Sequence, residues 1–160
     1  MGSNNVSVKK ITYYDYGVDV SILKHKIFTY CEANNITFNG VYGPPRGGLP
    51  IATHLAHAFN IELILKLIDV VDNQYDMYKN SRLLICDDVC DSGETFQTIN
   101  KLLTETCNLP SPIFCALFTK PRSYSLFPID LFVTEVSNDT WLMFPWEIND
   151  TPDKEYMKGY

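Results

Sequence analysis

The stretch Leu-Leu-Ile-Cys-Asp-Asp-Val-Cys-Asp-Ser-Gly-Glu-Thr, residues 83–95, carries most of the information in this sequence. Its first four residues are apolar, which is typical of a buried strand. Two carboxylates, Asp87 and Asp88, stand at the carboxyl end of that strand, and residues 91–95 then turn into an amphipathic helix. The free backbone N–H groups and the positive dipole at the start of such a helix favour a bound phosphate.

The adjacent acids of this stretch do not suit a simple anion site, because they would repel the anion. They suit sugar hydroxyls, bound directly or through a divalent cation that also neutralises phosphate charge. The alternative is an ordinary strand–turn–helix whose acids cap the helix, but capping requires one acid and this segment has three aspartates, Asp87, Asp88 and Asp91. The segment therefore predicts a site for a phosphorylated sugar that carries a metal-bound polyphosphate.

Apolar and polar segments alternate along the rest of the chain in a strand–helix rhythm. We expect helices over residues 18–34, 49–59 and 94–106, strands over residues 38–42, 61–68, 82–87, 113–119 and 130–135, and a loop over residues 72–81. This alternation predicts an α/β fold, a single domain with a mostly parallel open sheet flanked by helices. Ligands of such sheets bind at the carboxyl ends of the strands.

The composition of the chain limits the kinds of protein it can be and the kinds of partner it can bind. A chain of 160 residues supports one domain, and a formal net charge of −6 argues against a nucleic-acid partner. The five cysteines are odd in number and scattered, which favours reduced thiols. We find neither a secretory signal nor a long apolar span, so we expect a cytoplasmic protein with no membrane partner.

Residues 83–95 resemble the 5-phosphoribosyl-1-pyrophosphate (PRPP) signature of the type I phosphoribosyltransferases, and the resemblance extends over about residues 36–148. It implies that fold over residues 1–160, with a core of about 36–135 and a small hood from about 1–35 and 136–160. It also implies Mg²⁺ as cofactor and a homo-oligomer, either a dimer or a tetramer. Asp87 and Asp88 would bind the PRPP ribose and its metal, and residues Asp91, Ser92, Gly93, Glu94 and Thr95 would bind the 5-phosphate.

A second motif is the turn Gly43-Pro44-Pro45-Arg46-Gly47-Gly48 after the strand 38–42. Paired glycines let backbone N–H groups approach a ligand, and Arg46 adds a fixed positive charge. The alternative is a Pro/Gly turn with an exposed arginine. The turn resembles the pyrophosphate-binding loop of the family, which implies that Arg46, Gly47 and Gly48 bind pyrophosphate and that the Pro45–Arg46 peptide bond is cis.

Lys120 follows the strand 113–119 and would reach the same edge of the sheet. In the 6-oxopurine members of the family, the xanthine–guanine and hypoxanthine enzymes, a lysine here donates to the base carbonyl. Asp91 matches the aspartate that these enzymes place near N7 of the base, which implies a catalytic role. A surface lysine and a helix-capping aspartate are the alternatives. Many purine enzymes carry a further basic residue where Tyr124 stands here. This chain departs from that pattern, and Arg122 is a nearby basic residue to which we assign no role from the sequence.

Residues 141–147, Trp-Leu-Met-Phe-Pro-Trp-Glu, are similar to the C-terminal segment of the xanthine–guanine enzymes. The similarity implies that Trp141 stacks on the purine, that the Leu142 carbonyl accepts from the base edge, and that Glu147, with Asp88, approaches the metal–pyrophosphate group. Core packing is the alternative for Trp141 and also for Trp146.

The resemblance as a whole implies purine salvage. The 5-phosphoribosyl group of PRPP would be transferred to guanine, xanthine or hypoxanthine, giving the nucleoside monophosphate and pyrophosphate. A non-catalytic PRPP- or nucleotide-sensing protein of the same fold, or a phosphoribosyltransferase for another base, is the alternative. The segment between Ile68 and Arg82 is short for a loop that closes over PRPP, with Tyr75, Tyr78 and Lys79 as its candidates.

Overall fold

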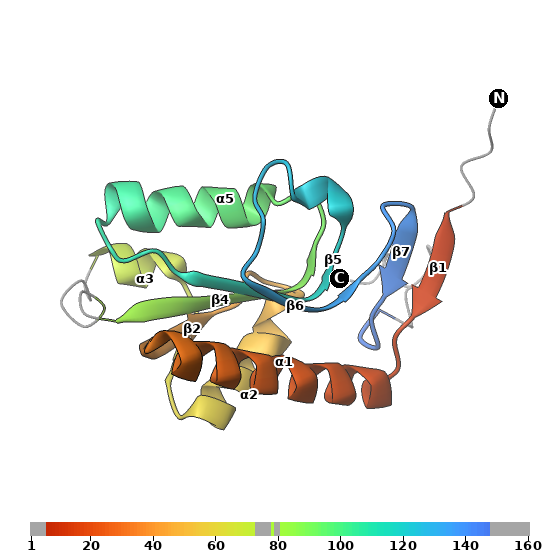
Figure 1. The fold of residues 1–160 in the computed structure, drawn as a ribbon, viewed down its shortest axis with the longest axis horizontal. Coiled ribbons are helices and arrows are strands. Elements are labelled where there is room, and N and C mark those ends of the chain that lie inside the picture. The colour runs from red at the N-terminus through yellow and green to blue at the C-terminus, as the bar shows by residue number, and fades with distance from the viewer. Residues whose placement is uncertain (1–5, 73–77, 79–80, 148–160) are drawn as a thin grey trace, which may run out of the picture. The chain divides into compact units, whose positions relative to one another are not determined.

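The computed structural model describes residues 6–72, 78 and 81–147 (Figure 1). The chain divides into two compact units. The larger unit is Asp19–Asn138, and the smaller unit combines the chain up to Val18 with the chain from Asp139 onward. The predicted single domain over residues 1–160, with a core of about 36–135 and a hood from about 1–35 and 136–160, stays a prediction.

A five-stranded parallel sheet with the strand order β3-β2-β4-β5-β6 forms the centre of the larger unit. Its strands are β2 (Phe38–Tyr42), β3 (Glu62–Ile64), β4 (Arg82–Cys90), β5 (Ile113–Thr119) and β6 (Leu131–Glu135). The helices are α1 (Tyr13–Asn34), α2 (Gly48–Phe59), α3 (Leu67–Asp72) and α5 (Glu94–Lys101), which continues as the π-helix η1 (Leu102–Thr106). Helix α5 covers one face of the sheet and α2 the other (Figure 1). The predicted α/β fold is confirmed.

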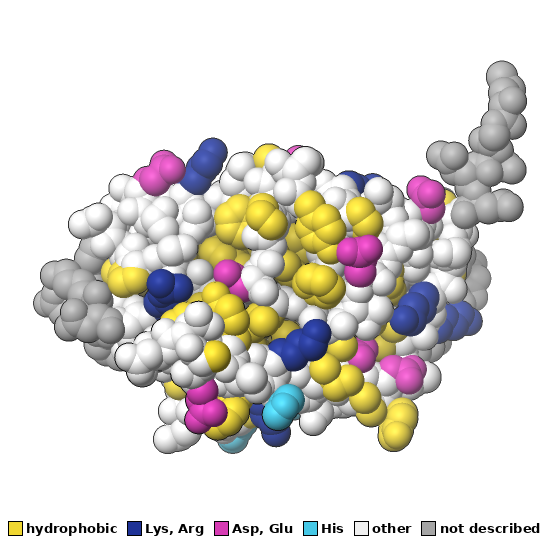
Figure 2. All heavy atoms as spheres, viewed as in Figure 1, with side chains coloured by type: hydrophobic (Ala, Val, Ile, Leu, Met, Phe, Trp, Pro, Cys, Tyr) yellow, Lys and Arg dark blue, Asp and Glu magenta, His cyan; other side chains and the backbone are white. Residues whose placement is uncertain are grey.

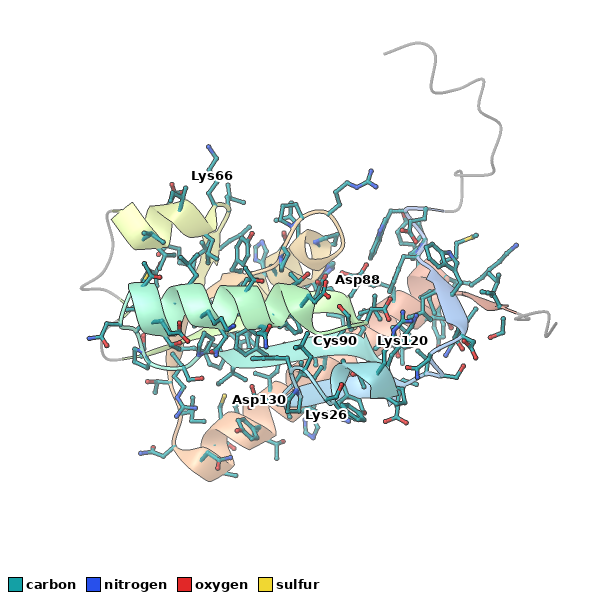
Figure 3. The ribbon with its side chains drawn as sticks, turned by 90° about the horizontal axis from the view of Figure 1, so that it is seen from above. Lys26, Lys66, Asp88, Cys90, Lys120 and Asp130 are labelled. Atoms are coloured by element: carbon teal, nitrogen blue, oxygen red, sulfur yellow. The ribbon has the colours of Figure 1, made fainter. Side chains whose placement is uncertain are left out.

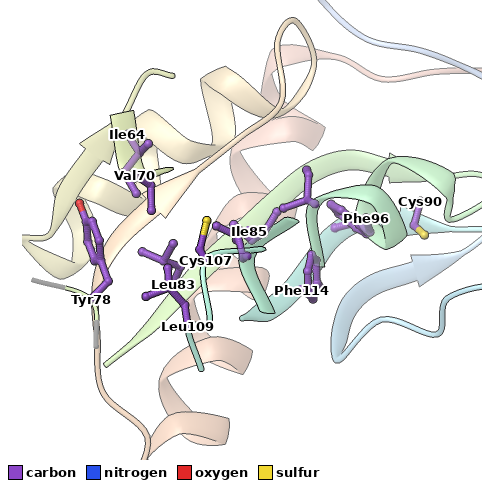
Figure 4. Packing of buried hydrophobic residues seen from close by; sticks show 13 residues of the cluster. Ile64, Val70, Tyr78, Leu83, Ile85, Cys90, Phe96, Cys107, Leu109 and Phe114 are labelled. Atoms are coloured by element: carbon purple, nitrogen blue, oxygen red, sulfur yellow. The ribbon is translucent and has the colours of Figure 1, made fainter. Parts of the chain in front are cut away.

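The core lies around β4 and β5. Every residue of β5 is buried, as expected for a central parallel strand that is covered on both faces. Phe96 of α5 packs against Phe114 of β5 with 5.1 Å between the ring centroids (Figure 4). The register pairs Cys90 with Thr119, so β4 and β5 end side by side. The residues that follow each strand, Asp91 and Lys120, therefore enter the same region.

The predicted strand over residues 61–68 is wrong in its second half. Strand β3 ends at Ile64, and the chain then forms α3, with Leu65 and Ile68 exposed at 63% and 54%. The physical reason is that β3 is an edge strand whose pairing with β2 ends at Ile64, so an apolar run beyond that point has no partner strand.

Other boundaries also differ from the prediction. Strand β4 runs on to Cys90, and β6 begins at Leu131. Helix α1 begins at Tyr13 rather than at residue 18, because Thr12 and Asp15 cap it reciprocally. The Asp15 N–H donates to the Thr12 hydroxyl at 3.1 Å, and the Thr12 N–H donates to the Asp15 carboxylate at 2.9 Å.

The smaller unit contains a two-stranded parallel sheet. Strand β1 (Ser7–Lys10) pairs with β7 (Thr140–Met143). The Trp146 ring stacks on Phe144 at 5.0 Å and meets Tyr16 edge-on at 5.4 Å, so Trp146 is a packing residue of this unit. None of the helices in the described part of the chain has the length and apolar character needed to cross a bilayer.

Candidate active site

The acidic pair Asp87 and Asp88 lies near the carboxyl end of β4. Figure 3 labels Asp88 there, close to Cys90. The Asp88 N–H donates to the Asp87 carboxylate at 2.9 Å, and the Val89 N–H donates to the Asp88 carboxylate at 2.7 Å. Burial, and then the neighbouring Asp88 charge, raise the pKa of Asp87 well above its usual range. Two partly buried carboxylates in contact favour a bound cation or hydroxyl donors, which would offset their repulsion.

The turn at residues 91–93, which the sequence predicts to bind a phosphate, leads from β4 into α5. Gly93 has φ 88°, a left-handed conformation that glycine adopts without strain, and an added Cβ would lie 3.1 Å from the Phe127 Cβ. The Ser92 hydroxyl accepts from the Glu94 N–H at 3.3 Å. A cavity of about 80 Å³, the size of a chemical group rather than of a whole ligand, is lined by Asp87, Val89, Cys90, Asp91, Ser92, Gly93, Thr95 and Phe96.

The glycine turn after β2 lies directly against the acidic pair. A Cβ on Gly47 would overlap the Asp88 carboxylate, so this contact requires glycine. The Pro45–Arg46 peptide bond is cis, which confirms that prediction. Arg46 is exposed at the tip of the turn, and α2 begins directly afterwards at Gly48. The predicted pyrophosphate loop and the predicted ribose-binding acids therefore form one continuous surface.

Lys120 and Asp91 form an ion pair beyond the ends of β5 and β4. The backbone N–H of Lys120 donates to the backbone carbonyl of Cys90 at 3.0 Å, which fixes the two chain segments against each other. The Lys120 Nζ lies 3.4 Å from the Asp91 Oδ1, and the two side chains are 8% and 46% exposed. Figure 3 shows Lys120 with Cys90 and Asp88 at this edge of the sheet. The predicted base-reading pair is thus in contact within the larger unit.

Three predicted residues, Trp141, Leu142 and Glu147, belong to the smaller unit. Trp141 is 60% exposed on β7, whereas Leu142 is buried. The Glu147 carboxylate accepts from the Phe144 N–H at 2.9 Å, which closes the turn after β7. Their roles toward a base or metal stay predictions.

The predicted closing loop lies mostly outside the described residues, and both Tyr75 and Lys79 fall there. Tyr78 is described and is fully buried, and its hydroxyl donates to the Glu62 carboxylate at 2.9 Å. The Tyr78 side chain is therefore held against β3.

The acidic pair Asp87 and Asp88 offers adjacent carboxylates to which a divalent cation could bind. Within residues 6–72, 78 and 81–147, no three side chains of the metal-binding types cluster. Mg²⁺ commonly binds through one or two carboxylates and keeps waters and substrate phosphate oxygens as its other ligands. Asp87 and Asp88 match that pattern, which predicts a metal held together with the substrate.

Sequence reasoning gave too little weight to Arg122. This residue lies in the short 3-10 helix Pro121–Ser123, and its Nε donates to the Asp91 Oδ1 at 2.6 Å. Tyr124, which stands where a basic residue was expected, donates its hydroxyl to the Glu135 carboxylate. The available signal for Arg122 was its position, two residues beyond Lys120 in a turn that follows a central strand.

Comparison with known proteins assigns the chain to a family. It is 30% identical over 122 residues to xanthine-guanine phosphoribosyltransferase of Nitratidesulfovibrio vulgaris, an alignment that covers 69% of each chain. It is 32% identical over 121 residues to the enzyme of the same name from Desulfotalea psychrophila, covering 69% of this chain and 71% of the relative. No protein-family model matches the chain.

Solved structures share the fold. A purine phosphoribosyltransferase from Pyrococcus horikoshii superimposes with a TM-score of 0.69 at 24% identity, covering 87% of this chain and 93% of that one. The xanthine-guanine-hypoxanthine phosphoribosyltransferase of Helicobacter pylori gives a TM-score of 0.69 at 18% identity, with coverage of 96% and 99%.

Proposed function

The chain belongs to the family of the xanthine–guanine phosphoribosyltransferases, and on that premise we propose how it transfers the 5-phosphoribosyl group of PRPP to a 6-oxopurine. The products are the purine nucleoside monophosphate and pyrophosphate, so the activity is purine salvage. The observation that carries the assignment of the site is the contact of Gly47 with Asp88 on one side of the sheet edge, combined with the Asp91–Lys120 ion pair on the other.

The PRPP molecule would lie across the carboxyl ends of the strands, with separate binding groups for its 5-phosphate, its ribose and its pyrophosphate. The 5-phosphate binds in the small cavity at the start of α5, where backbone N–H groups and the helix dipole favour an anion. Asp87 and Asp88 accept hydrogen bonds from the ribose hydroxyls. Arg46 and the backbone N–H groups of Gly47 and Gly48 bind the pyrophosphate, because they offer a positive charge and donors in the turn whose Gly47 lies against Asp88.

Cleavage of the bond between ribose C1 and the pyrophosphate oxygen builds positive charge on the ribose and negative charge on the leaving group. Arg46 and the N–H groups of its turn stabilise the leaving group where that charge grows. The carboxylates of Asp87 and Asp88 lie on the ribose side, where they favour the cationic sugar. When bound by these two acids, Mg²⁺ supplies further charge neutralisation for the pyrophosphate.

The base would be read by Lys120 and Asp91. The ammonium of Lys120 donates to the oxo group at position 6, and the Asp91 carboxylate accepts the ring N–H and assists removal of its proton. Adenine places an amino group opposite the Lys120 donor, which leaves a buried donor without an acceptor and lowers its rate of reaction. Trp141, Leu142 and Glu147 are proposed to stack on the base, accept from its edge and approach the metal.

We also propose a cytoplasmic location and a homo-oligomer. All five cysteines are buried free thiols, which suits a reducing compartment. Figure 2 shows hydrophobic side chains gathered over the region of β6, which is one of the two edge strands of the sheet and whose first four residues are only half-buried. Apolar patches of this kind are typical of protein contacts, and light scattering after size-exclusion chromatography tests the assembly.

The direct test of this function is pyrophosphate release by the purified protein with PRPP, Mg²⁺ and one base at a time. We expect release with guanine, xanthine or hypoxanthine, and little with adenine or orotate. Binding of PRPP without turnover of any base would instead support a sensing protein of the same fold.

A further inference from the structure

Asp91 is bound by two cations, and these are not equivalent. Its Oδ1 accepts from the Arg122 Nε at 2.6 Å and also contacts the Arg122 Nη2. The Lys120 Nζ lies 3.4 Å from the same oxygen, beyond the usual range of an N–H···O hydrogen bond. Within the described part of the chain, the second oxygen, Oδ2, accepts no hydrogen bond.

The Arg122–Asp91 pair is poorly suited to stabilising the fold. Both side chains are nearly half exposed, at 47% and 46%, and exposed ion pairs contribute little to stability. The turn that carries Arg122 is held by other groups. The Arg122 N–H donates to the Asn138 Oδ1 at 3.0 Å, and the buried Ser123 hydroxyl donates to the Lys120 carbonyl at 2.9 Å. These bonds therefore fix the position of Arg122, and the turn does not depend on the Arg122 side chain.

We propose that Arg122 is a positioning residue for recognition of the base, an inference that rests on the proposed roles of Asp91 and Lys120. By occupying Oδ1, the guanidinium fixes the rotamer of Asp91 and leaves Oδ2 for the ring N–H of the purine. It also keeps the carboxylate from drawing the Lys120 ammonium into a close one-to-one pair. Lys120 is nearly buried, so its donors are then directed to the oxo group of the ligand.

Steady-state kinetics of Arg122→Gln and Arg122→Lys test this inference, with the 6-oxopurine that the wild-type protein uses best. We expect Arg122→Gln to raise KM for the base about tenfold or more, while KM for PRPP stays within about twofold. Arg122→Lys should recover part of the loss, because an ammonium donates to the carboxylate but cannot form the fork of a guanidinium. Arg82→Gln, the same change at the exposed start of β4, is the matched control and should alter neither constant.

A double-mutant cycle separates positioning from a structural role. In an Asp91→Asn background, Arg122→Gln should add less than about twofold to KM for the base, because the carboxylate it positions is already absent. Equal effects of Arg122→Gln in both backgrounds would overturn the proposal, as would a rise confined to KM for PRPP. So would a large fall in the melting temperature of the variant. A wild-type protein that is inactive with every base would instead refute the proposed function itself.

Discussion

Asp91 is the residue that the proposed phosphate site and the proposed base site share. It opens the turn at the start of α5 and also lies against Lys120 and Arg122. Replacement by asparagine keeps the shape and the capacity to accept in the turn, but it removes the charge. We expect Asp91→Asn to retain the fold and to lower the rate with 6-oxopurines by about ten- to a hundredfold, which reaches the lower end of the range for a lost general base.

Turnover measured with saturating PRPP and base checks this prediction. Asp69→Asn, the same change at an exposed position of α3, serves as the control and should keep wild-type turnover. A rate for Asp91→Asn equal to that of the control would remove Asp91 from the chemistry.

The raised pKa of Asp87 predicts that the stability of the fold depends on pH. Burial and the Asp88 charge raise its pKa in the folded chain above the value of an unfolded aspartate. The folded state therefore binds the proton more tightly, so the stabilisation is present at low pH and is lost as the pH rises from the unfolded value through the raised folded value.

Asp87→Asn removes this titration while it preserves the size of the side chain. Relative to wild type, we expect the free energy of unfolding of the variant to gain at least about 1.4 kcal/mol between pH 5 and pH 8, the equivalent of one pKa unit. Urea unfolding at both pH values, without metal or substrate, gives the comparison. If the free energies of unfolding of the two proteins changed equally with pH, the ionised Asp87 carboxylate would not be destabilised in the folded chain.

At the scale of elements, the turn into α5 depends on the left-handed backbone of Gly93. Alanine at this position is strained at φ 88° and would lie against Phe127. We expect Gly93→Ala to raise KM for PRPP severalfold, by moving the N–H groups that bind the 5-phosphate, and to lower the melting temperature.

Gly17→Ala is the matched control for this substitution, because Gly17 lies in α1 and an added Cβ would meet no atom within 4 Å. This control should keep KM for PRPP and stabilise the helix slightly. An unchanged KM for PRPP in Gly93→Ala would contradict the assignment of the turn as the phosphate loop.

The sequence predicted the central elements better than the peripheral ones. Strand β5 was predicted correctly because it is buried along its whole length, so its continuous apolar run indicates a central strand. The apolar run at residues 61–68 resembles that of β5 in sequence. Its pairing with β2 stops at Ile64, however, and the sequence does not show where a strand stops pairing with its neighbour. The start of α1 was missed although Thr12 and Asp15 carry the signal of a capping pair.

For the site, the sequence motifs placed Asp87, Asp88 and Lys120 because each follows or ends a strand of one parallel sheet. The ion pair of Arg122 with Asp91 could not be predicted, since it depends on how the turn after β5 folds back toward α5.

At the scale of the whole molecule, the metal is expected to serve catalysis and not folding. The described residues hold no cluster of three metal-binding side chains that could support the fold. We therefore expect EDTA to abolish turnover and added Mg²⁺ to restore it, while the melting temperature in EDTA stays within about 2 °C of the untreated protein, far less than the loss of a structural metal would cause. Full turnover in EDTA would contradict the role of the acidic pair.

A competition among bases tests the central claim, that this sheet edge joins PRPP to a 6-oxopurine, most directly. The purified protein is given PRPP, Mg²⁺ and an equimolar mixture of guanine, xanthine, hypoxanthine and adenine, and the nucleotides formed are separated and quantified with the pyrophosphate. Because competing substrates partition by their kcat/KM values, we predict 6-oxopurine nucleotides in equal amount to pyrophosphate, and no detectable adenosine monophosphate. Adenosine monophosphate as the main product, or no nucleotide from any base, would contradict it.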